Sequence, residues 1–587
     1  MIKEAIYHKP VNQYAYSYNN KTLHIMLQSK RNDLKSVQLI YGDPYDFTGE
    51  RWDYKKKEMT KSGVTNSLDY WKVAIEPPYR RLRYGFRCES TNGEVIYFTE
   101  RGYFKEQPNV IGSYFCFPYL HEVDTFTAPE WVKDTVWYQI FPERFANGDP
   151  SINPKGTLAW GKHDPTPTNY FGGDFQGVID HLDYLIDLGV TGIYFTPIFK
   201  AGSNHKYDTI DYFEIDPQFG DKETFKRLVQ LCHEKGIRVM LDAVFNHSGY
   251  YFAPFQDVLE KGEASKYKDW FHIWDFPVKT DPRPNYDAFG YVGSMPKLNT
   301  ANPEVKAYLL KAARYWIEEF DIDGWRLDVA NEVDHAFWRA FRNEVRQVKP
   351  DVYILGEIWH DSMKWLQGDQ FDAVMNYPFT DSVVDFFGTK KIQVQQFHDQ
   401  IINLLHMYPM NVHEVMFNLL DSHDTARIAT LANENKASVR LMYLFQLSFI
   451  GSPCLYYGDE IGMVGGEEPE SRACMEWDHS KQDLDLFNFV QQLIRLRKEN
   501  PAFGGRGSFD FIQIDEEKNS LVYQKQDSNK QFIFVINNKE KSQRIYVPGL
   551  ADKQYQPLFH DQGSMLDESG HVELGAYGYQ CYCIESH

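Results

Sequence analysis

The chain has 587 residues, and its 82 acidic and 62 basic side chains give it a formal net charge of -20 at pH 7. This charge argues against nucleic acid or an anionic membrane as a partner, because their phosphates would repel the protein. No apolar run approaches the ~20 residues that cross a bilayer. The length predicts several domains.

The N-terminus and the cysteines bear on the compartment. The first residues, MIKEAIYHKPVNQ, contain no apolar segment typical of a secretion signal, although a chain whose signal had been removed would look the same. The seven cysteines are odd in number and match no zinc-binding spacing, which favours reduced thiols over a disulfide framework. We therefore expect a cytoplasmic protein. The cysteines are Cys88, Cys116, Cys232, Cys454, Cys474, Cys581 and Cys583.

Residues 1–122 have the pattern of short β-strands. Leu23, Ile25 and Leu27 alternate with polar residues, and turn-rich stretches such as 41–44 separate this run from later ones. Evenly spaced short strands of this kind predict an N-terminal β-sandwich. The later runs are 37–41, 70–75, 82–88 and 95–104.

Strands and helices alternate over residues 123–502. A helix is predicted over 174–188, ending at Gly189, and another begins after Asp221 and ends at Gly236. Eight strands separated by helices predict a (β/α)8 TIM barrel as the central domain of a multidomain protein. The predicted strands are 136–140, 192–196, 237–245, 324–329, 352–357, 371–376, 415–421 and 453–457.

Two further regions depart from the alternation. After the third strand, residues 246–301 form a long connection rich in Tyr, Phe, Trp and Pro. A connection of this length is usually functional, and we expect a small inserted domain. Residues 503–587 return to strand patterning, for example at 521–524 and 532–536, which predicts a C-terminal all-β domain.

Polar residues follow several predicted strands at their carboxyl ends, where the active site of an α/β barrel lies. Each one alone at a strand end is more often a structural group. Their joint occurrence after strands three, four, five and seven therefore carries the functional hypothesis. The residues are Asp242, Asn246 and His247, Arg326 and Asp328, Glu357, and Asp421, His423 and Asp424.

These residues suit glycosidic bond hydrolysis, which uses two carboxyl groups that flank the bond. Arg326 shares a strand face with Asp328 and is expected to hold that carboxyl ionised, which favours Asp328 as nucleophile. Glu357 has no cation beside it in sequence and is followed by Ile358 and Trp359. Weaker solvation would raise the pKa of Glu357 and favour the acid role.

The strand-end segments resemble the four conserved regions of the alpha-amylase family, glycoside hydrolase family 13. The matching segments are DAVFNH at 242–247, GWRLDVANE at 324–332, GEIW at 356–359 and NLLDSHD at 418–424. Within that family, MPKLN at 295–299 and VANEV at 329–333 resemble the neopullulanase, cyclomaltodextrinase and maltogenic amylase group. The resemblance extends over essentially the whole chain.

The resemblance implies a double displacement that retains the α-configuration. Asp328 is then the nucleophile, Glu357 the proton donor and Asp424 the carboxylate that stabilises the transition state. Glu468 departs from the group, which often has Asp at this position. The residues implied in sugar binding are Asp242, His247, Arg326, His423, Tyr207, Glu468 and Arg472.

The resemblance also implies a structural Ca²⁺ ion. Oxygen ligands of the kind that Ca²⁺ prefers occur at Asn147, Asp149, Asn153, Gly172 and Asp174, although such clusters are also common in turns. Further expectations are that the N-terminal domain is starch-binding-like and forms a homodimer, that the protein acts on cyclodextrins, pullulan and short maltodextrins, and that it carries out some transglycosylation. The alternatives are an α-amylase or α-glucosidase on the same barrel, or a non-catalytic glucan-binding accessory protein, a class that loses the catalytic carboxylates.

Overall fold

The computed structural model describes residues 1–551, 553–560 and 566–585. Internal contacts divide the chain into two compact units. Unit 1 comprises Met1–Thr127, Met363–Asp369 and Val394–His413, and unit 2 comprises Ala128–Ser362, Gln370–Gln393 and Glu414–His587. Two segments of unit 1 thus come from within the range 123–502 that was expected to form the barrel.

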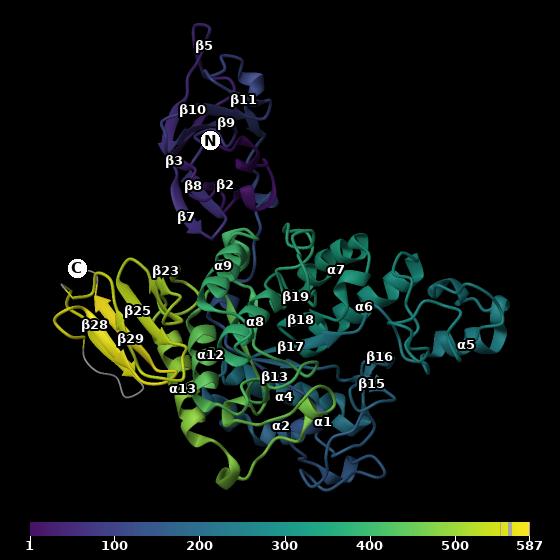
Figure 1. Ribbon diagram of the computed structural model, residues 1–587. Helices are drawn as coiled ribbons and strands as arrows, with labels where there is room; N and C mark the ends of the chain where they lie inside the picture. The colour runs from purple at the N-terminus through teal and green to yellow at the C-terminus, as the bar shows by residue number, and fades with distance from the viewer. Residues whose placement is uncertain (552, 561–565, 586–587) are drawn as a thin grey trace. The chain divides into compact units, whose positions relative to one another are not determined.

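Unit 1 contains the predicted N-terminal β-sandwich (Figure 1). One sheet has the order β1-β2-β8-β7 and the other β11-β10-β9-β3-β6, with β12 also paired to β9. Apolar residues of both sheets, such as Leu23 and Ile25 in one and Leu39 in the other, form a single core. The strands are β1 (Ala15–Ser17), β2 (Leu23–Lys30), β3 (Leu34–Gly42), β6 (Lys55–Glu58), β7 (Thr60–Val64), β8 (Leu68–Ile75), β9 (Leu82–Ser90), β10 (Val95–Thr99), β11 (Gly102–Phe104) and β12 (Phe115–Phe117).

Two helices from later in the chain belong to the same unit as the sandwich. They are α9 (Val394–Leu405) and α10 (Met410–His413). His406 between them stacks on the ring of Tyr70, with centroids 4.2 Å apart, and contacts the Ser62 hydroxyl at 2.9 Å. Gly63 permits this approach, because a Cβ there would collide with the His406 ring.

Unit 2 is built around the predicted parallel barrel, so the expected fold class is confirmed (Figure 1). The strand order is β20-β19-β18-β17-β14-β13-β22-β21, and a parallel bridge between Met375 and Phe417 joins the two ends. The strands are β13 (Trp137–Ile140), β14 (Gly192–Phe195), β17 (Arg238–Ala243), β18 (Gly324–Leu327), β19 (Tyr353–Gly356), β20 (Ala373–Val374), β21 (Phe417–Leu419) and β22 (Ser452–Tyr456).

The helix predicted over 174–188 is two helices. The chain leaves helical geometry at His181, whose φ is -113° and ψ is 14°, and the His181 ring contacts the Gly177 carbonyl at 2.8 Å. The helices of the barrel region are α1 (Pro142–Phe145), α2 (Phe175–Asp180), α3 (Leu182–Leu188), α4 (Lys222–Glu234), α6 (Pro303–Phe320), α7 (His335–Val348), α8 (Tyr377–Val383), α11 (Ile428–Leu431), α12 (Lys436–Ser448) and α13 (Leu484–Glu499).

The long connection after β17 carries its own small structure. It contains α5 (Ala253–Lys261), and isolated bridges such as Ile273 to Tyr286 and Ala288 to Pro296 hold the rest together. A further bridge joins His247 to Lys297, so the connection returns to the end of β17. This geometry brings the aromatic segment beside the carboxyl ends of the barrel strands.

The C-terminal region is all-β, as predicted. Its main sheet has the order β23-β24-β25-β29-β27, and β26 pairs with β28. It packs on α12, where Tyr523 contacts the Ser448 hydroxyl at 2.8 Å and the Phe445 ring at 5.4 Å. The strands are β23 (Ser508–Asp515), β24 (Ser520–Gln526), β25 (Lys530–Asn537), β26 (Gln543–Tyr546), β27 (Gln556–His560), β28 (His571–Leu574) and β29 (Tyr579–Glu585).

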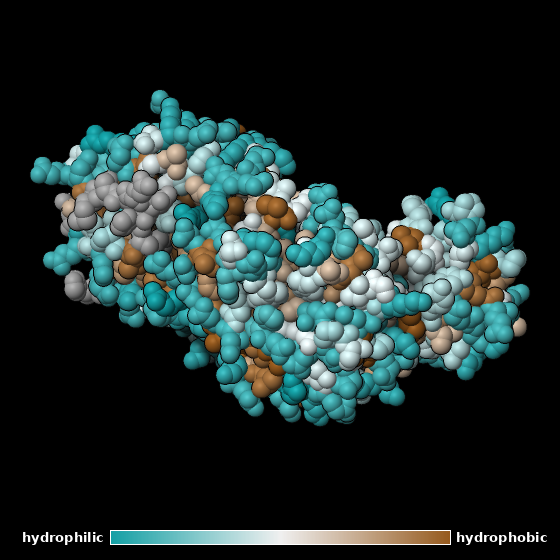
Figure 2. Space-filling model, turned by 90° about the horizontal axis from the view of Figure 1, so that it is seen from below, coloured by the Kyte–Doolittle hydropathy of each residue, from teal (hydrophilic) through white to brown (hydrophobic). Residues whose placement is uncertain are grey.

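No helix in the described part of the chain is both long enough and apolar enough to cross a membrane. On the face shown in Figure 2, hydrophobic residues form small separate patches among hydrophilic ones. All seven cysteines are free thiols, and five of them are buried.

Candidate active site

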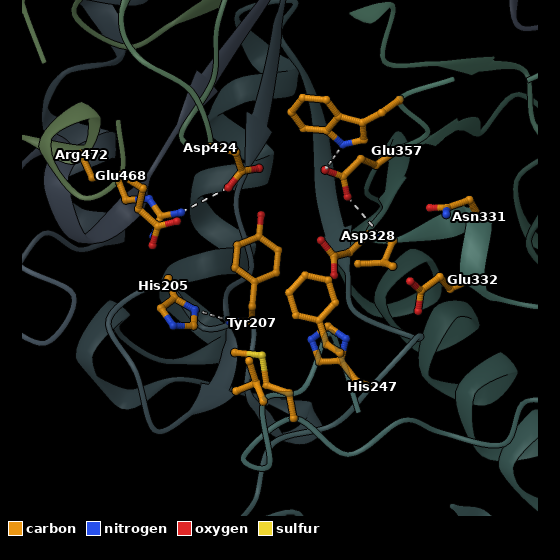
Figure 3. Close-up of a pocket in the computed structure, with 15 residues that line it drawn as sticks. His205, Tyr207, His247, Asp328, Asn331, Glu332, Glu357, Asp424, Glu468 and Arg472 are labelled. Atoms are coloured by element: carbon orange, nitrogen blue, oxygen red, sulfur yellow. Dashed lines mark hydrogen bonds and ion pairs between the residues drawn. The ribbon is translucent and has the colours of Figure 1, made fainter. Parts of the chain in front are cut away.

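The carboxyl ends of the barrel strands surround a cavity of about 470 Å³ (Figure 3). The three predicted catalytic carboxylates, Asp328, Glu357 and Asp424, all line it. They reach it from the ends of β18, β19 and β21, which the barrel brings to one mouth. The other lining residues are His205, Tyr207, His247, Phe289, Val292, Met295, Val329, Asn331, Glu332, Trp359, Glu468 and Arg472.

Arg326 is the charged centre beneath this cavity. Its side chain is fully buried on β18. Nη1 donates to both oxygens of Asp242 at 3.0 Å and to Asp328 at 2.8 Å, and Nη2 lies 2.9 Å from Glu357. One guanidinium therefore joins the two predicted reacting carboxylates and a third acid. A planar group with several donors suits this arrangement.

The electrostatic reasoning from sequence neighbours is wrong on two points. Burial raises the pKa of the Asp328 carboxyl well above its usual range, and Arg326 opposes this shift without reversing it. Glu357, which has no cation beside it in sequence, meets Arg326 in space at 2.9 Å. The barrel brings one cation to both acids, so sequence neighbours do not distinguish nucleophile from acid.

The backbone after Asp328 is held in a strained conformation. Val329 has φ 45° and ψ 42°, in the left-handed region that β-branched residues avoid. In this conformation its N–H donates to Glu357 Oε2 at 3.0 Å. The strain, of the order of 1–3 kcal/mol, thus places a donor on the second carboxylate.

Glu357 has a third contact, made by the oxygen that also faces Arg326. Trp359 Nε1 donates to Glu357 Oε1 at 3.3 Å. The indole stacks on Tyr377, with centroids 3.6 Å apart and planes 9° from parallel. Trp359 nevertheless remains 50% exposed, so one face of the ring is open at the cavity.

Asp424 faces the other two carboxylates across the cavity (Figure 3). It accepts a hydrogen bond from Arg472 Nη2 at 3.2 Å, and Arg472 Nη1 binds Glu468 at 2.7 Å. Arg472 Nε donates to the His423 carbonyl at 2.8 Å, which anchors the guanidinium to the segment that carries Asp424. Glu468 therefore lines the cavity while it is ion-paired with Arg472.

Three predicted sugar-binding residues, Asp242, Arg326 and His423, lie behind the cavity wall and not on it. They support Tyr207, which does line the cavity. Its hydroxyl donates to Asp242 at 2.9 Å and lies 2.6 Å from His423 Nε2. Burial lowers the pKa of His423 below its usual range, so the ring is neutral at neutral pH. In this arrangement the three residues position lining groups, and their contact with sugar stays a prediction.

Two histidines face the cavity as neutral rings. Burial lowers the pKa of His247 to about 3 and that of His205 to about 4. His247 Nδ1 lies 3.2 Å from the Asn246 amide nitrogen, and its Nε2 has no hydrogen-bond partner in the described part of the chain. A neutral ring whose Nδ1 accepts carries its proton on Nε2, where it can donate to a sugar oxygen.

Several lining residues were not predicted individually. Asn331 and Glu332 lie in the VANEV segment, which served only as a mark of resemblance. Phe289 comes from the inserted segment and stacks on His247, with centroids 5.2 Å apart. The length of that segment predicted a functional role, but periodicity does not reveal which of its rings reach the cavity.

Lys297 links the two group-specific motifs. It lies in MPKLN, and its Nζ donates to the Asn246 side chain and, at 2.9 Å, to the Glu332 carbonyl in VANEV. Its ammonium also lies 3.5 Å from the Glu332 carboxylate. The inserted segment is thereby joined to the loop that follows Asp328.

The five predicted cation ligands lie close together before and at the start of α2. Asn147 Nδ2 donates to Asn153 Oδ1 at 3.1 Å, which leaves Asn147 Oδ1 buried and unpartnered among the described residues. A side chain at Gly172, where φ is 83°, would collide with both asparagines. A buried amide oxygen without a partner, beside space that only glycine leaves open, suits a hard cation such as Ca²⁺.

The two carboxylates of this cluster have other partners. Asp174 accepts from the backbone amides of Gly148, Asp149 and Gly177 and caps α2. Asp149 Oδ1 accepts from Ser151. In the described ranges no cluster of three His, Cys, Asp or Glu side chains could hold a metal, so a cation here would depend largely on amide and backbone oxygens.

Comparisons with known proteins agree with this geometry. Residues 139–482 match the family model described as alpha amylase, catalytic domain, and residues 1–121 match alpha amylase, N-terminal ig-like domain. A cyclomaltodextrinase of Geobacillus thermopakistaniensis (strain MAS1) is 57% identical, with 100% of both chains covered. A maltogenic alpha-amylase of Bacillus acidopullulyticus is 52% identical, with 99% of both covered. A solved cyclomaltodextrinase structure has a TM-score of 0.93 at 49% identity and covers 100% of both chains.

Proposed function

Because the chain belongs to the alpha-amylase family of glycoside hydrolases, we propose that it hydrolyses α-glucosidic bonds in cyclodextrins, pullulan and short maltodextrins. The observation that carries the proposal is the pair Asp328 and Glu357, joined through Arg326 at one cavity. The names of the relatives support the substrate class. The cavity of about 470 Å³ suits a short stretch of glucan.

The proposed reaction is a double displacement in two steps. Asp328 attacks the anomeric carbon while Glu357 gives its proton to the leaving glycosidic oxygen, so a glycosyl ester forms as the glycosidic bond breaks. Glu357 then removes a proton from water, whose oxygen displaces Asp328 and releases the sugar. A second sugar hydroxyl in place of water would give transglycosylation.

Site-directed variants test the two roles. Asp328→Asn and Glu357→Gln should each lower kcat by about 10²–10⁴-fold or more, because a nucleophile or a general acid is lost. Both replacements preserve shape, so the melting temperature should change little. Near-full activity of Glu357→Gln would exclude it as the acid. Release of a β-anomer, read by NMR, would exclude retention.

Substrate comparison tests the glucan class. Rates on β-cyclodextrin, pullulan and soluble starch should favour the first two, and pullulan should yield panose. Faster hydrolysis of starch than of β-cyclodextrin would instead support an ordinary α-amylase. Transglycosylation is tested by supplying a labelled glucose acceptor and measuring its incorporation into longer products.

We propose a structural Ca²⁺ ion at Asn147, Asp149, Asn153, Gly172 and Asp174. The orphaned Asn147 Oδ1 and the open cradle at Gly172 support it. The ion would stabilise the turn before α2 and take no part in bond cleavage. A chelator should lower the melting temperature, and Asn147→Ala should abolish that dependence. Immediate loss of kcat on chelation, without a change in melting temperature, would contradict the proposal.

We also propose a homodimer and a cytoplasmic location. Exposed aromatic residues of unit 1 support a protein contact: Tyr45 is 77% and Tyr79 59% exposed, and the Arg81 guanidinium covers the Tyr45 ring at 4.7 Å. Free thiols support a reducing compartment. Sedimentation as a monomer at micromolar protein concentration would exclude the dimer. Recovery of the native enzyme from outside the cell would exclude a cytoplasmic location.

A further inference from the structure

Gln139 is a buried amide inside the barrel, in a strand that is otherwise apolar or aromatic. The strand is β13, and the residue is only 1% exposed. Its side chain shares a strand face with Trp137, whose ring stacks on Tyr353 across the barrel at a centroid distance of 5.9 Å. A buried amide costs free energy unless it is hydrogen-bonded. Gln139 Nε2 lies 2.7 Å from His423 Nδ1.

The Tyr207 hydroxyl, on the other side of the His423 ring, has one proton and two neighbours. It lies 2.9 Å from Asp242 Oδ2 and 2.6 Å from His423 Nε2. Burial raises the pKa of Asp242 to about 6, and Arg326 limits this shift, so the group is a carboxylate at neutral pH. A carboxylate only accepts, so the Tyr207 proton is directed to Asp242. His423 Nε2 must therefore be the donor in the second contact.

Asp424 leads independently to the same position for the ring proton. Its Oδ1 lies 3.2 Å from His423 Nε2. A lone pair on Nε2 would face this carboxylate oxygen and repel it, whereas an N–H group can donate to it. A proton on Nε2 thus satisfies both Asp424 and Tyr207.

The His423 ring carries only this one proton. Burial lowers its pKa well below the ordinary value, and nearby cations lower it further. The charged and titratable groups around the ring are Tyr207, Asp424, Arg326, Arg472 and His205. A neutral ring with its proton on Nε2 has a lone pair on Nδ1, which needs a donor. In the contact at 2.7 Å, that donor is the Gln139 amide.

We propose that Gln139 is a positioning residue that fixes the tautomer of His423. Its amide donates to Nδ1, so Nε2 keeps its proton and donates to the Tyr207 hydroxyl and to Asp424. Both of these groups line the catalytic cavity, whereas Gln139 is not among its described lining residues and acts through His423. The kinetic part of this inference rests on the proposed function, in which Asp424 stabilises the transition state.

Nitrogen NMR measures the tautomer directly. The full chain is labelled with [¹⁵N]histidine, and His423→Gln identifies the signals of this ring. At pH 7 the parent should show an unprotonated Nδ1 and a protonated Nε2. Gln139→Met keeps the size of the side chain but has no donor, so the ratio of the two tautomers should shift about tenfold towards Nδ1–H.

Kinetics measure what this tautomer contributes to the reaction. In Gln139→Met, Asp424 and Tyr207 lose part of their shared donor, and kcat on β-cyclodextrin should fall about tenfold. The KM should change little, because Asp424 is assigned to the transition state and not to the bound substrate.

Gln446 on α12 provides the matched control. It is also 1% exposed, and its Nε2 donates to the backbone carbonyls of Asn418 and Cys454 at 3.0 and 2.9 Å. Gln446→Met removes a buried amide of the same size and should lower the melting temperature, as Gln139→Met does. It should leave the tautomer of His423 and the value of kcat unchanged.

The outcomes separate this inference from the proposed function. An Nδ1–H tautomer in the parent would overturn the inference, and this measurement requires neither a folded variant nor turnover of glucan. An unchanged tautomer ratio in folded Gln139→Met would overturn it as well, and so would equal losses of kcat in Gln139→Met and Gln446→Met. If the parent hydrolyses neither cyclodextrin nor pullulan, the proposed function fails, while an Nε2–H tautomer that depends on Gln139 still supports the contact.

Discussion

The two units hold their buried polar groups in different ways. Around the catalytic cavity of unit 2, Arg326 pairs with three carboxylates within 3.0 Å. Unit 1 instead buries neutral rings: burial lowers the pKa of His8 and of His406 to about 4. Each ring is held by a carbonyl and a hydroxyl, for His406 those of Ile402 and Ser62.

The two regions offset the free-energy cost of burying polar groups in different ways. A buried charge is tolerated only with a partner, so the loss of one member leaves the others uncompensated. A buried neutral histidine needs no ion partner, but it resists protonation. Unit 2 should therefore be sensitive to removal of its central cation. The buried neutral histidines, His8 and His406 in unit 1 and His205 and His247 in unit 2, should make both units sensitive to a fall in pH.

The largest expected effect is that of Arg326→Met. It leaves three buried carboxylates without their cation, which should lower the free energy of unfolding by about 3–5 kcal/mol and abolish measurable activity. Arg314 is a matched control, because it contacts Glu318 and Glu344 but lies at the surface. Arg314→Met should change the melting temperature little. Equal losses in the two variants would contradict the contrast between buried and exposed pairs.

The next effect is acid destabilisation through the histidines of unit 1. Since the pKa of His8 and of His406 is lower in the folded state, the unfolded chain binds more protons below pH 6.5. Stability is therefore complete above this pH and falls as the pH decreases towards 4. Each histidine should contribute about 2 kcal/mol to the loss at pH 5.

Melting temperatures at pH 7 and pH 5 measure this effect. His406→Gln should lose less between the two pH values than the parent, by roughly 4–8 °C, although it is less stable than the parent at pH 7. The exposed His163→Gln should behave as the parent does. If the melting temperature falls by the same amount between pH 7 and pH 5 in the parent and in His406→Gln, His406 makes no contribution to acid destabilisation.

The smallest effect concerns Lys297, which joins the inserted segment to the loop after Asp328. Lys297→Met should lower kcat/KM on β-cyclodextrin by about tenfold, equivalent to about 1.4 kcal/mol of transition-state stabilisation. Lys279 is an exposed lysine of the same segment, and Lys279→Met should have no effect. If both variants retain full kcat/KM, the link between MPKLN and VANEV is structural only.

Periodicity was sufficient for most of the fold. The strand around Trp325 and the helix between Asp221 and Gly236 were predicted within a few residues, because burial on both faces and an apolar helical stripe are local signals. The break at His181 was missed, because apolar spacing continues across it. The association of 394–413 with the sandwich has no local signal at all, since it depends on the fit of His406 against Tyr70 and Gly63.

The candidate site divides in the same way. Asp328, Glu357 and Asp424 were found from sequence because each directly follows a recognisable strand, and the barrel topology then brings strand ends together. The sequence alone also indicated the family and, through MPKLN and VANEV, the group. Only the tertiary structure showed that Arg326 contacts both Asp328 and Glu357 and that His423 lies behind the wall. Burial and contact angles arise from segments distant in the chain, so no local pattern encodes them.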